Sequence, residues 1–127
     1  MTGTTLPAVT SDVFKAVTTR NEKSLVLVLS GTADLRAQSG LETYLFQINE
    51  IALSTEVPEV VVDIRRLEFL NSSCFKAFVS WVGQLQEIEH TRQYRIRFLS
   101  DARLLWQRRS LHALSCFAVD LITVESS

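Results

Sequence analysis

The sequence predicts a single α/β domain in which one mixed β-sheet carries crossover helices packed mainly on one face. Short segments rich in β-branched and apolar residues alternate along the chain with segments whose apolar residues recur at the helical period. Strands connected through helices require right-handed crossovers, so this alternation predicts at least partly parallel pairing. The chain of 127 residues has the length of about one domain.

The expected order is strand, strand, helix, strand, helix, strand, helix, strand. The first two strands form a hairpin through a turn at residues 21–23. Continuously apolar runs such as L-V-L-V-L at 25–29 are typical of strands buried on both faces. A connection is expected at residues 65–70. The expected strands are residues 12–19, 25–29, 59–64, 94–98 and 119–124.

Three segments show helical periodicity. The first begins at Leu35 and carries an apolar stripe from Leu41 to Ala52. The second covers residues 72–89, and the third is capped by Ser100 and Asp101 and runs to about residue 109. Residues 1–11 are expected to be a flexible N-terminus and residues 125–127 a short tail. The expected domain therefore spans residues 12–124.

Composition and motifs exclude several classes of protein. The net charge of −1 excludes a polycation that binds nucleic acid directly. Cys74 and Cys116 form neither a disulfide framework nor a zinc motif. The four glycines do not form a dinucleotide-binding or P-loop pattern. The N-terminus lacks the features of a signal peptide, so we expect a cytoplasmic domain without cofactor, metal or membrane contact.

The most informative segment is V-V-V-D-I-R-R-L-E-F-L-N-S-S-C-F-K-A-F-V at residues 60–79. An apolar strand leads through a connection into the polar triplet Asn71-Ser72-Ser73, which opens an amphipathic helix. Helix capping alone explains such a triplet, because Asn and Ser are preferred N-cap residues. A phosphate on Ser72 would also be favoured there, beside unpaired N–H groups and the positive end of the helix dipole. Capping and phosphorylation are compatible.

This segment resembles the STAS domain, the family of anti-sigma factor antagonists. The family pattern is an apolar strand ending in Asp, a short loop, and Asp-Ser-Ser/Thr-Gly at a helix start. L-V-L-V-L-S-G-T-A-D-L at 25–35 and the strand, helix and Ser110-Leu111 at 97–114 are similar to further family elements in the same order. The resemblance covers residues 12–124.

The resemblance implies that Ser72 is a phosphoacceptor, with Ser73 as the alternative. Three positions depart from the family: Asn71 replaces Asp, Cys74 replaces Gly, and Ser110 replaces a late Gly. The first change removes a charge beside the phosphoacceptor, and the second adds a side chain where a partner approaches. The partner-binding residues that we expect are Asn71, Ser72, Ser73, Cys74, Phe75, Phe78 and Trp81.

The function implied by the resemblance is a non-enzymatic signalling switch in bacterial transcription regulation. It would bind a Ser/Thr kinase-type anti-sigma factor or a related protein, and phosphorylation of Ser72 would weaken that binding. A phosphorylation-independent adaptor is the alternative. An enzyme using Cys74 or Ser73 is disfavoured, because the S-x-x-K match at residues 73–76 lacks its accompanying motifs, and Cys74 is more simply a small buried hydrophobe. The oligomeric state stays open.

The charge is unevenly distributed along the chain. Residues 1–64 carry four Lys or Arg and eight Asp or Glu, which gives a net charge of −4. Residues 65–127 carry nine Lys or Arg and six Asp or Glu, which gives a net charge of +3. Six arginines lie between Arg92 and Arg109, where Asp101 is the only acidic residue. They form either a solvated face or a landing site for an acidic partner or a phosphate. We expect His90 to cap the end of a helix.

Overall fold

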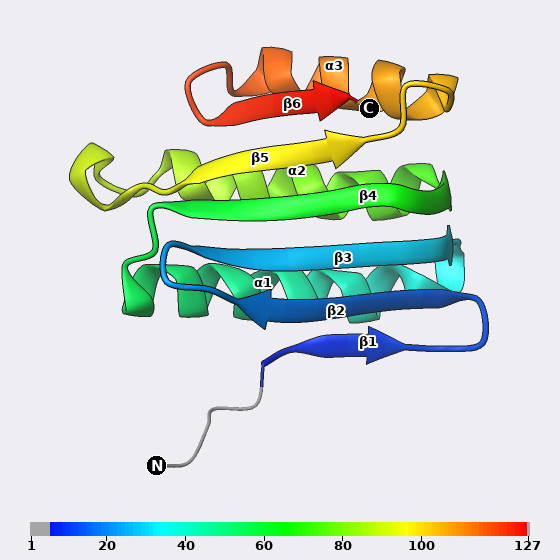
Figure 1. The fold of residues 1–127 in the computed structure, drawn as a ribbon, viewed down its shortest axis with the longest axis horizontal. Helices are drawn as coiled ribbons and strands as arrows, with labels where there is room; N and C mark the ends of the chain where they lie inside the picture. Colours follow the sequence, from blue (N-terminus) through cyan, green and yellow to red (C-terminus); the bar gives the residue numbers. More distant parts are fainter. Residues whose placement is uncertain (1–5, 127) are drawn as a thin grey trace.

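The structure is a computed structural model that describes residues 6–126 as one mixed sheet with three α-helices (Figure 1). The strands are β1 (Ala8–Thr10), β2 (Phe14–Arg20), β3 (Ser24–Ala33), β4 (Glu59–Leu70), β5 (Arg95–Ser100) and β6 (Ile122–Ser126). The helices are α1 (Gln38–Thr55), α2 (Ser72–Gln86) and α3 (Leu105–Phe117), with 3₁₀ turns η1 (Leu35–Ala37) and η2 (His90–Arg92). None of these helices is long and apolar enough to cross a membrane.

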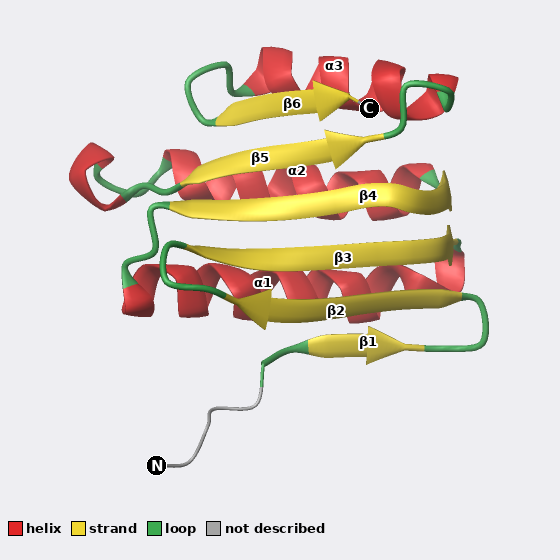
Figure 2. Ribbon diagram, viewed as in Figure 1, coloured by secondary structure: helices red, strands yellow, loops and turns green. Residues whose placement is uncertain are grey.

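The six strands lie side by side in sequence order. Strand β2 pairs antiparallel with β1 and β3, whereas β3, β4, β5 and β6 pair parallel. All three helices lie on the same side of the sheet (Figure 2), which we call the covered face; the opposite side is the open face. The predicted fold class is confirmed. Strands β3, β4 and β5 all end at the right-hand side of Figure 1, the carboxyl edge, where α2 and α3 begin.

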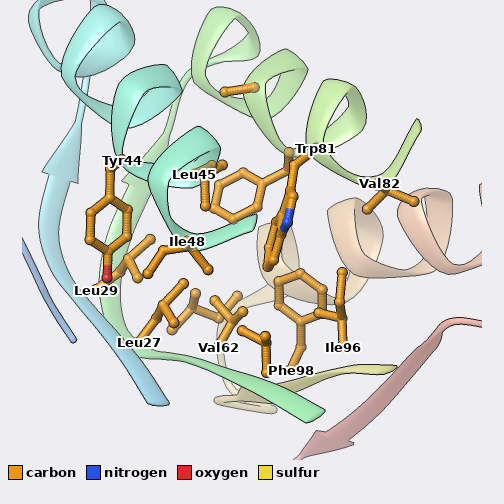
Figure 3. Packing of buried hydrophobic residues seen from close by; sticks show 14 of the residues in the cluster. Leu27, Leu29, Tyr44, Leu45, Ile48, Val62, Trp81, Val82, Ile96 and Phe98 are labelled. Atoms are coloured by element: carbon orange, nitrogen blue, oxygen red, sulfur yellow. The ribbon is translucent and has the colours of Figure 1, made fainter. Parts of the chain in front are cut away.

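The core fills the space between the covered face and the helices. Alternate residues of β3 (Leu25, Leu27 and Leu29) are fully buried there. Trp81 of α2 lies over Phe98 of β5 (Figure 3). The residues between them in β3 are half-buried on the open face, so the expectation that this strand is buried on both faces is wrong. No helix covers the second side of the sheet.

Buried polar side chains connect the helices to the sheet within this core. The Trp81 Nε1–H donates to the Tyr94 hydroxyl at 2.7 Å, and this hydroxyl donates to Asn49 Oδ1 at 2.6 Å. The Thr18 and Tyr44 hydroxyls form a further hydrogen bond of 2.7 Å. Each of these groups would be costly to bury without its partner, so the network fixes the positions of α1, α2 and β5 relative to one another.

The N-terminal half contains one strand that the sequence did not indicate. Strand β1 falls within residues 1–11, which were expected to form no element, and it pairs with β2. The Thr18 hydroxyl donates to the Pro7 carbonyl at 2.8 Å, and Val9 packs against the core. These contacts add an edge strand to the sheet. Residues 1–5 and Ser127 lie outside the described residues. The expected tail at 125–127 is wrong for Glu125 and Ser126, which belong to β6 and pair with β5.

Several boundaries in the C-terminal half also differ. Residues 65–70, expected as a connection, continue β4 to Leu70. Helix α3 begins at Leu105, later than expected, because the Asp101 side chain accepts from the Arg103 N–H in a turn instead of capping a helix. It continues to Phe117, beyond the expected end near residue 109. Helix α2 ends at Gln86, so His90 lies in η2 and does not cap it.

Candidate functional site

The carboxyl edge brings the polar triplet next to the end of β3. Asn71 caps α2, since its Oδ1 accepts from the Cys74 N–H at 2.9 Å. Its own N–H donates to the Ala33 carbonyl at 2.9 Å. The capping interpretation is therefore confirmed for Asn71. The start of α2 is fixed against the segment that leads into η1.

Ser72 is exposed as the first residue of α2, whereas Ser73 is half-buried. The first-turn N–H groups and the helix dipole give this position a positive partial charge. Lys76, four residues on and also exposed, adds a cation on the same side of the helix. The position is accessible to a modifying enzyme and electrostatically suited to a phosphate.

Cys74 is fully buried and lies beneath the first turn of α2. Its Sγ donates to the Asp34 carbonyl at 3.3 Å. Burial raises the pKa of the thiol, and the negative charges of Asp34 and Glu42 raise it further. The thiol is therefore neither a contact for a partner, as we had expected, nor an activated nucleophile. Its burial agrees with the prediction of a small buried hydrophobe.

Two expected docking residues are part of the core. Phe78 and Trp81 are only 3% and 2% exposed, so neither side chain can reach a partner. Their rings pack against each other with centroids 6.3 Å apart, and Phe78 also contacts Phe98. The apolar face of α2 points toward the sheet over this length of the helix. Phe75 is half-buried and retains accessible surface beside Ser72.

The carboxyl edge also exposes large apolar residues that the sequence analysis did not select. Leu35 of η1 is 65% exposed, Phe69 at the end of β4 is 49% exposed and Leu105 at the start of α3 is 54% exposed. Thr32 pairs with Phe69 immediately before the Ala33–Leu70 pair, which places Phe69 close to the start of α2. For Phe69 the signal in the sequence was an apolar residue within a segment expected to be a connection, whereas Leu35 and Leu105 lay in segments expected to be helical.

The arginines between residues 92 and 109 do not form one surface. Arg97 of β5 forms ion pairs with Glu59 and Glu125, at 3.0 and 3.1 Å, on the open face. Arg103 pairs with Asp101 at 2.8 Å at the carboxyl edge, whereas Arg92 lies in η2, beyond the C-terminal end of α2. A single landing site made by the whole cluster is therefore excluded. Glu59 and Glu125 also pair with an arginine of this cluster, so Asp101 is not its only acidic partner.

An enzyme using Ser73 would need this hydroxyl in contact with a base such as Lys76. No hydrogen bond joins Ser73 to Lys76 among residues 6–126, and Ser73 is only half accessible. Across the same residues, no group of three or more His, Cys, Asp or Glu side chains could hold a metal ion. The site has the character of a binding surface: a capped helix start with an exposed hydroxyl, flanked by exposed apolar side chains.

The fold is that of the STAS domain, as comparison with solved structures shows. An anti-sigma factor antagonist from Mycobacterium paratuberculosis has a TM-score of 0.62 and 15% sequence identity, over 91% of this chain and 87% of its own. SpoIIAA, an anti-sigma factor antagonist solved in its unphosphorylated form, has a TM-score of 0.51 and 16% identity, over 87% of each chain. No family model matches the sequence, and no curated protein matches it.

Proposed function

We propose that this chain is a non-enzymatic switch protein that binds a Ser/Thr kinase-type anti-sigma factor through its carboxyl edge. The observation that carries the proposal is the exposed Ser72 at the start of α2, next to exposed apolar side chains on a STAS fold. The two similar structures are described as anti-sigma factor antagonists. The chain would act on bacterial transcription from the cytoplasm, through its protein partner.

The docking surface would consist of Asn71, Ser72 and Ser73 with the apolar residues around them. Phe69 and Leu35 offer accessible apolar area, and Phe75 offers its exposed part. Protein interfaces commonly combine a few apolar or aromatic anchors with a polar rim. The exposed Ser72 hydroxyl would lie within such an interface, where its chemical state affects binding.

Phosphorylation would act on binding and leave the fold intact. The kinase would transfer the γ-phosphoryl group of ATP to Ser72 Oγ, with release of ADP and of the hydroxyl proton. The product carries about −1.5 to −2 charges. The N-terminus of α2 and Lys76 would accommodate this charge in the free protein, but docking would desolvate it beside Phe69 and Phe75. The affinity for the partner would therefore fall.

The test combines modification mapping with binding. The full chain is incubated with ATP and the candidate kinase encoded nearest to it in its genome, and mass spectrometry locates the phosphate. Ser72→Asp should bind the partner at least about tenfold more weakly than Ser72→Ala. Ser80→Asp is the matched control, because Ser80 is exposed further along the same helix. No phosphate on Ser72 or Ser73, with equal binding by the two Ser72 variants, would contradict the switch.

A phosphorylation-independent adaptor is favoured by one feature. The Asn71 side chain is neutral and its Oδ1 is already used in the cap, so this position supplies no carboxylate beside Ser72. In an adaptor, Phe75→Asp would abolish capture of the partner and Ser72→Asp would not. If both variants lose the partner, the switch is retained and the adaptor is rejected.

A further inference from the structure

The same ion pair recurs along three neighbouring parallel strands. Asp-x-Arg occurs after β3, within β4 and after β5, as Asp34–Arg36, Asp63–Arg65 and Asp101–Arg103. In each, the arginine Nη2 donates to the carboxylate, at 2.7, 2.8 and 2.8 Å in this order. The arginine backbone N–H donates to the same carboxylate. Each guanidinium thus pairs with its aspartate through Nε and Nη2, with Nη1 outside the pair.

Strand β4 contains two β-bulges where it passes β3. Val28 pairs with Asp63 and Ser30 with Arg66, so one residue of β3 faces two of β4. A second extra residue lies between the partners of Gly31 and Thr32. The first bulge breaks the alternation of side chains, and as a result the consecutive residues Arg65 and Arg66 are both exposed.

The buried side chain of Gln107 stabilises this bulge from the covered face. Gln107 is fully buried, and its Nε2 donates to the carbonyls of Ile64 and Leu67, at 2.6 and 3.0 Å. Its Oε1 accepts from the Asp101 N–H at 2.9 Å. One side chain of α3 therefore fixes both the bulge in β4 and the turn after β5. The arginines on the open face are positioned by this rigid support.

The bulge and the turn surround a hollow of about 740 Å³, within the size range of small-molecule sites. Its lining consists of Val28, Asp63, Arg65, Arg66, Asp101 and Arg103. The three arginines and two aspartates give the lining a net charge of +1. Arg66 takes part in none of the ion pairs formed among residues 6–126. The Arg66 guanidinium is therefore available to a ligand. The Nη1 groups of Arg65 and Arg103 are available as well, because their ion pairs use Nε and Nη2.

We propose that this hollow on the open face binds a small molecule carrying adjacent phosphate or carboxylate groups. Three arginines line it, and the guanidinium groups of Arg65 and Arg103 are paired with Asp63 and Asp101. Guanidinium forms strong charge-assisted hydrogen bonds with such anions, and prior fixation reduces the entropy lost on binding. The hollow shares no lining residue with the docking surface around Ser72 and does not depend on the function proposed for that surface.

The test is an NMR titration of the full chain with inorganic pyrophosphate and, separately, citrate. Saturable shifts are expected in the backbone amides of residues 63–66 and 101–103. Arg66→Ala should weaken binding about tenfold, the effect of losing one charge-assisted contact. Arg92→Ala is the matched control, because it removes the same charge from an exposed position in η2, and it should change the affinity less than about twofold.

Two further comparisons complete the test. Arg65→Lys keeps the charge but loses the fork that pairs with Asp63, so it should also weaken binding. Stronger binding of pyrophosphate would identify a phosphate site, and stronger binding of citrate a polycarboxylate site. Non-saturating shifts, or equal losses in Arg66→Ala and Arg92→Ala, would overturn the proposal, because they indicate general charge attraction only.

Discussion

The two faces of the sheet carry different chemistry on the same strands. On the covered face, β3, β4 and β5 present apolar side chains to the helices, and the buried Gln107 and Asn49 have hydrogen-bond partners. On the open face β4 and β5 present charged side chains such as Asp63, Arg65 and Arg97 in partly exposed ion pairs, whereas β3 presents uncharged side chains. Burial stabilises the fold by much more than exposed pairs, which contribute about 0–1 kcal/mol each. The open face can therefore change without loss of the fold.

The strongest test of this difference is Trp81→Ala on the covered face. The substitution removes a large buried ring and the donor to the Tyr94 hydroxyl, so the free energy of unfolding should fall by about 3–5 kcal/mol. Urea denaturation measures the loss. Trp106→Ala is the control, because Trp106 is only half-buried and should cost less. An unchanged unfolding midpoint for Trp81→Ala would contradict a structural role for this ring.

Gln107→Ala should have the next largest effect. It leaves the carbonyls of Ile64 and Leu67 and the Asp101 N–H without their partner. The free energy of unfolding should fall by about 1–3 kcal/mol, because buried polar groups would be left unsatisfied. Gln86→Ala is the matched control, because its bond to the Phe117 carbonyl is exposed. Equal losses in the two variants would show that the bulge in β4 does not require Gln107.

The covered face was largely predictable from the sequence, because burial leaves a periodic signal. The continuous apolar run of β3 and the apolar stripe of α1 placed both elements, and the order of strands and helices followed, although the run did not show that β3 is buried on one face only. The same signal misplaced the docking surface, since Phe78 and Trp81 share a helix with Ser72 but face the core. Periodicity identifies the apolar side of a helix without indicating whether a partner or the sheet covers it.

The carboxyl edge was less predictable, because irregular backbone determines it. Two bulges carry β4 through residues 65–70, which local sequence describes equally well as a connection. The carbonyls of Ile64 and Leu67, at the first bulge, accept hydrogen bonds from Gln107, some 40 residues further along the chain. Long-range hydrogen bonds of this kind leave no local pattern. By contrast, the Asn71 cap was recognisable, since a cap needs only adjacent residues.

At the start of α2, Ser72→Asp should stabilise the protein slightly. A carboxylate at the first position of α2 interacts favourably with the helix dipole, so the free energy of unfolding should rise by about 0.3–1 kcal/mol at low ionic strength. Thermal unfolding at low and high salt measures this gain, which salt should reduce. Ser80→Asp, in the middle of the helix, should give none. Destabilisation by Ser72→Asp would contradict the view that phosphorylation leaves the fold intact.

The smallest effect is expected on the open side, at Asp101. The Arg103 side chain, and then its backbone N–H, lower the pKa of Asp101 to about 2 from 3.8. Because the pKa is lower in the folded state, this carboxylate stabilises the protein above pH 4, and the contribution is lost as the pH falls toward 2. NMR titration of the carboxyl carbon should give a midpoint near 2, and Arg103→Gln should raise it. An ordinary midpoint in the unaltered chain would show that Arg103 is not held by Asp101 in solution, and that the hollow lacks one of its fixed cations.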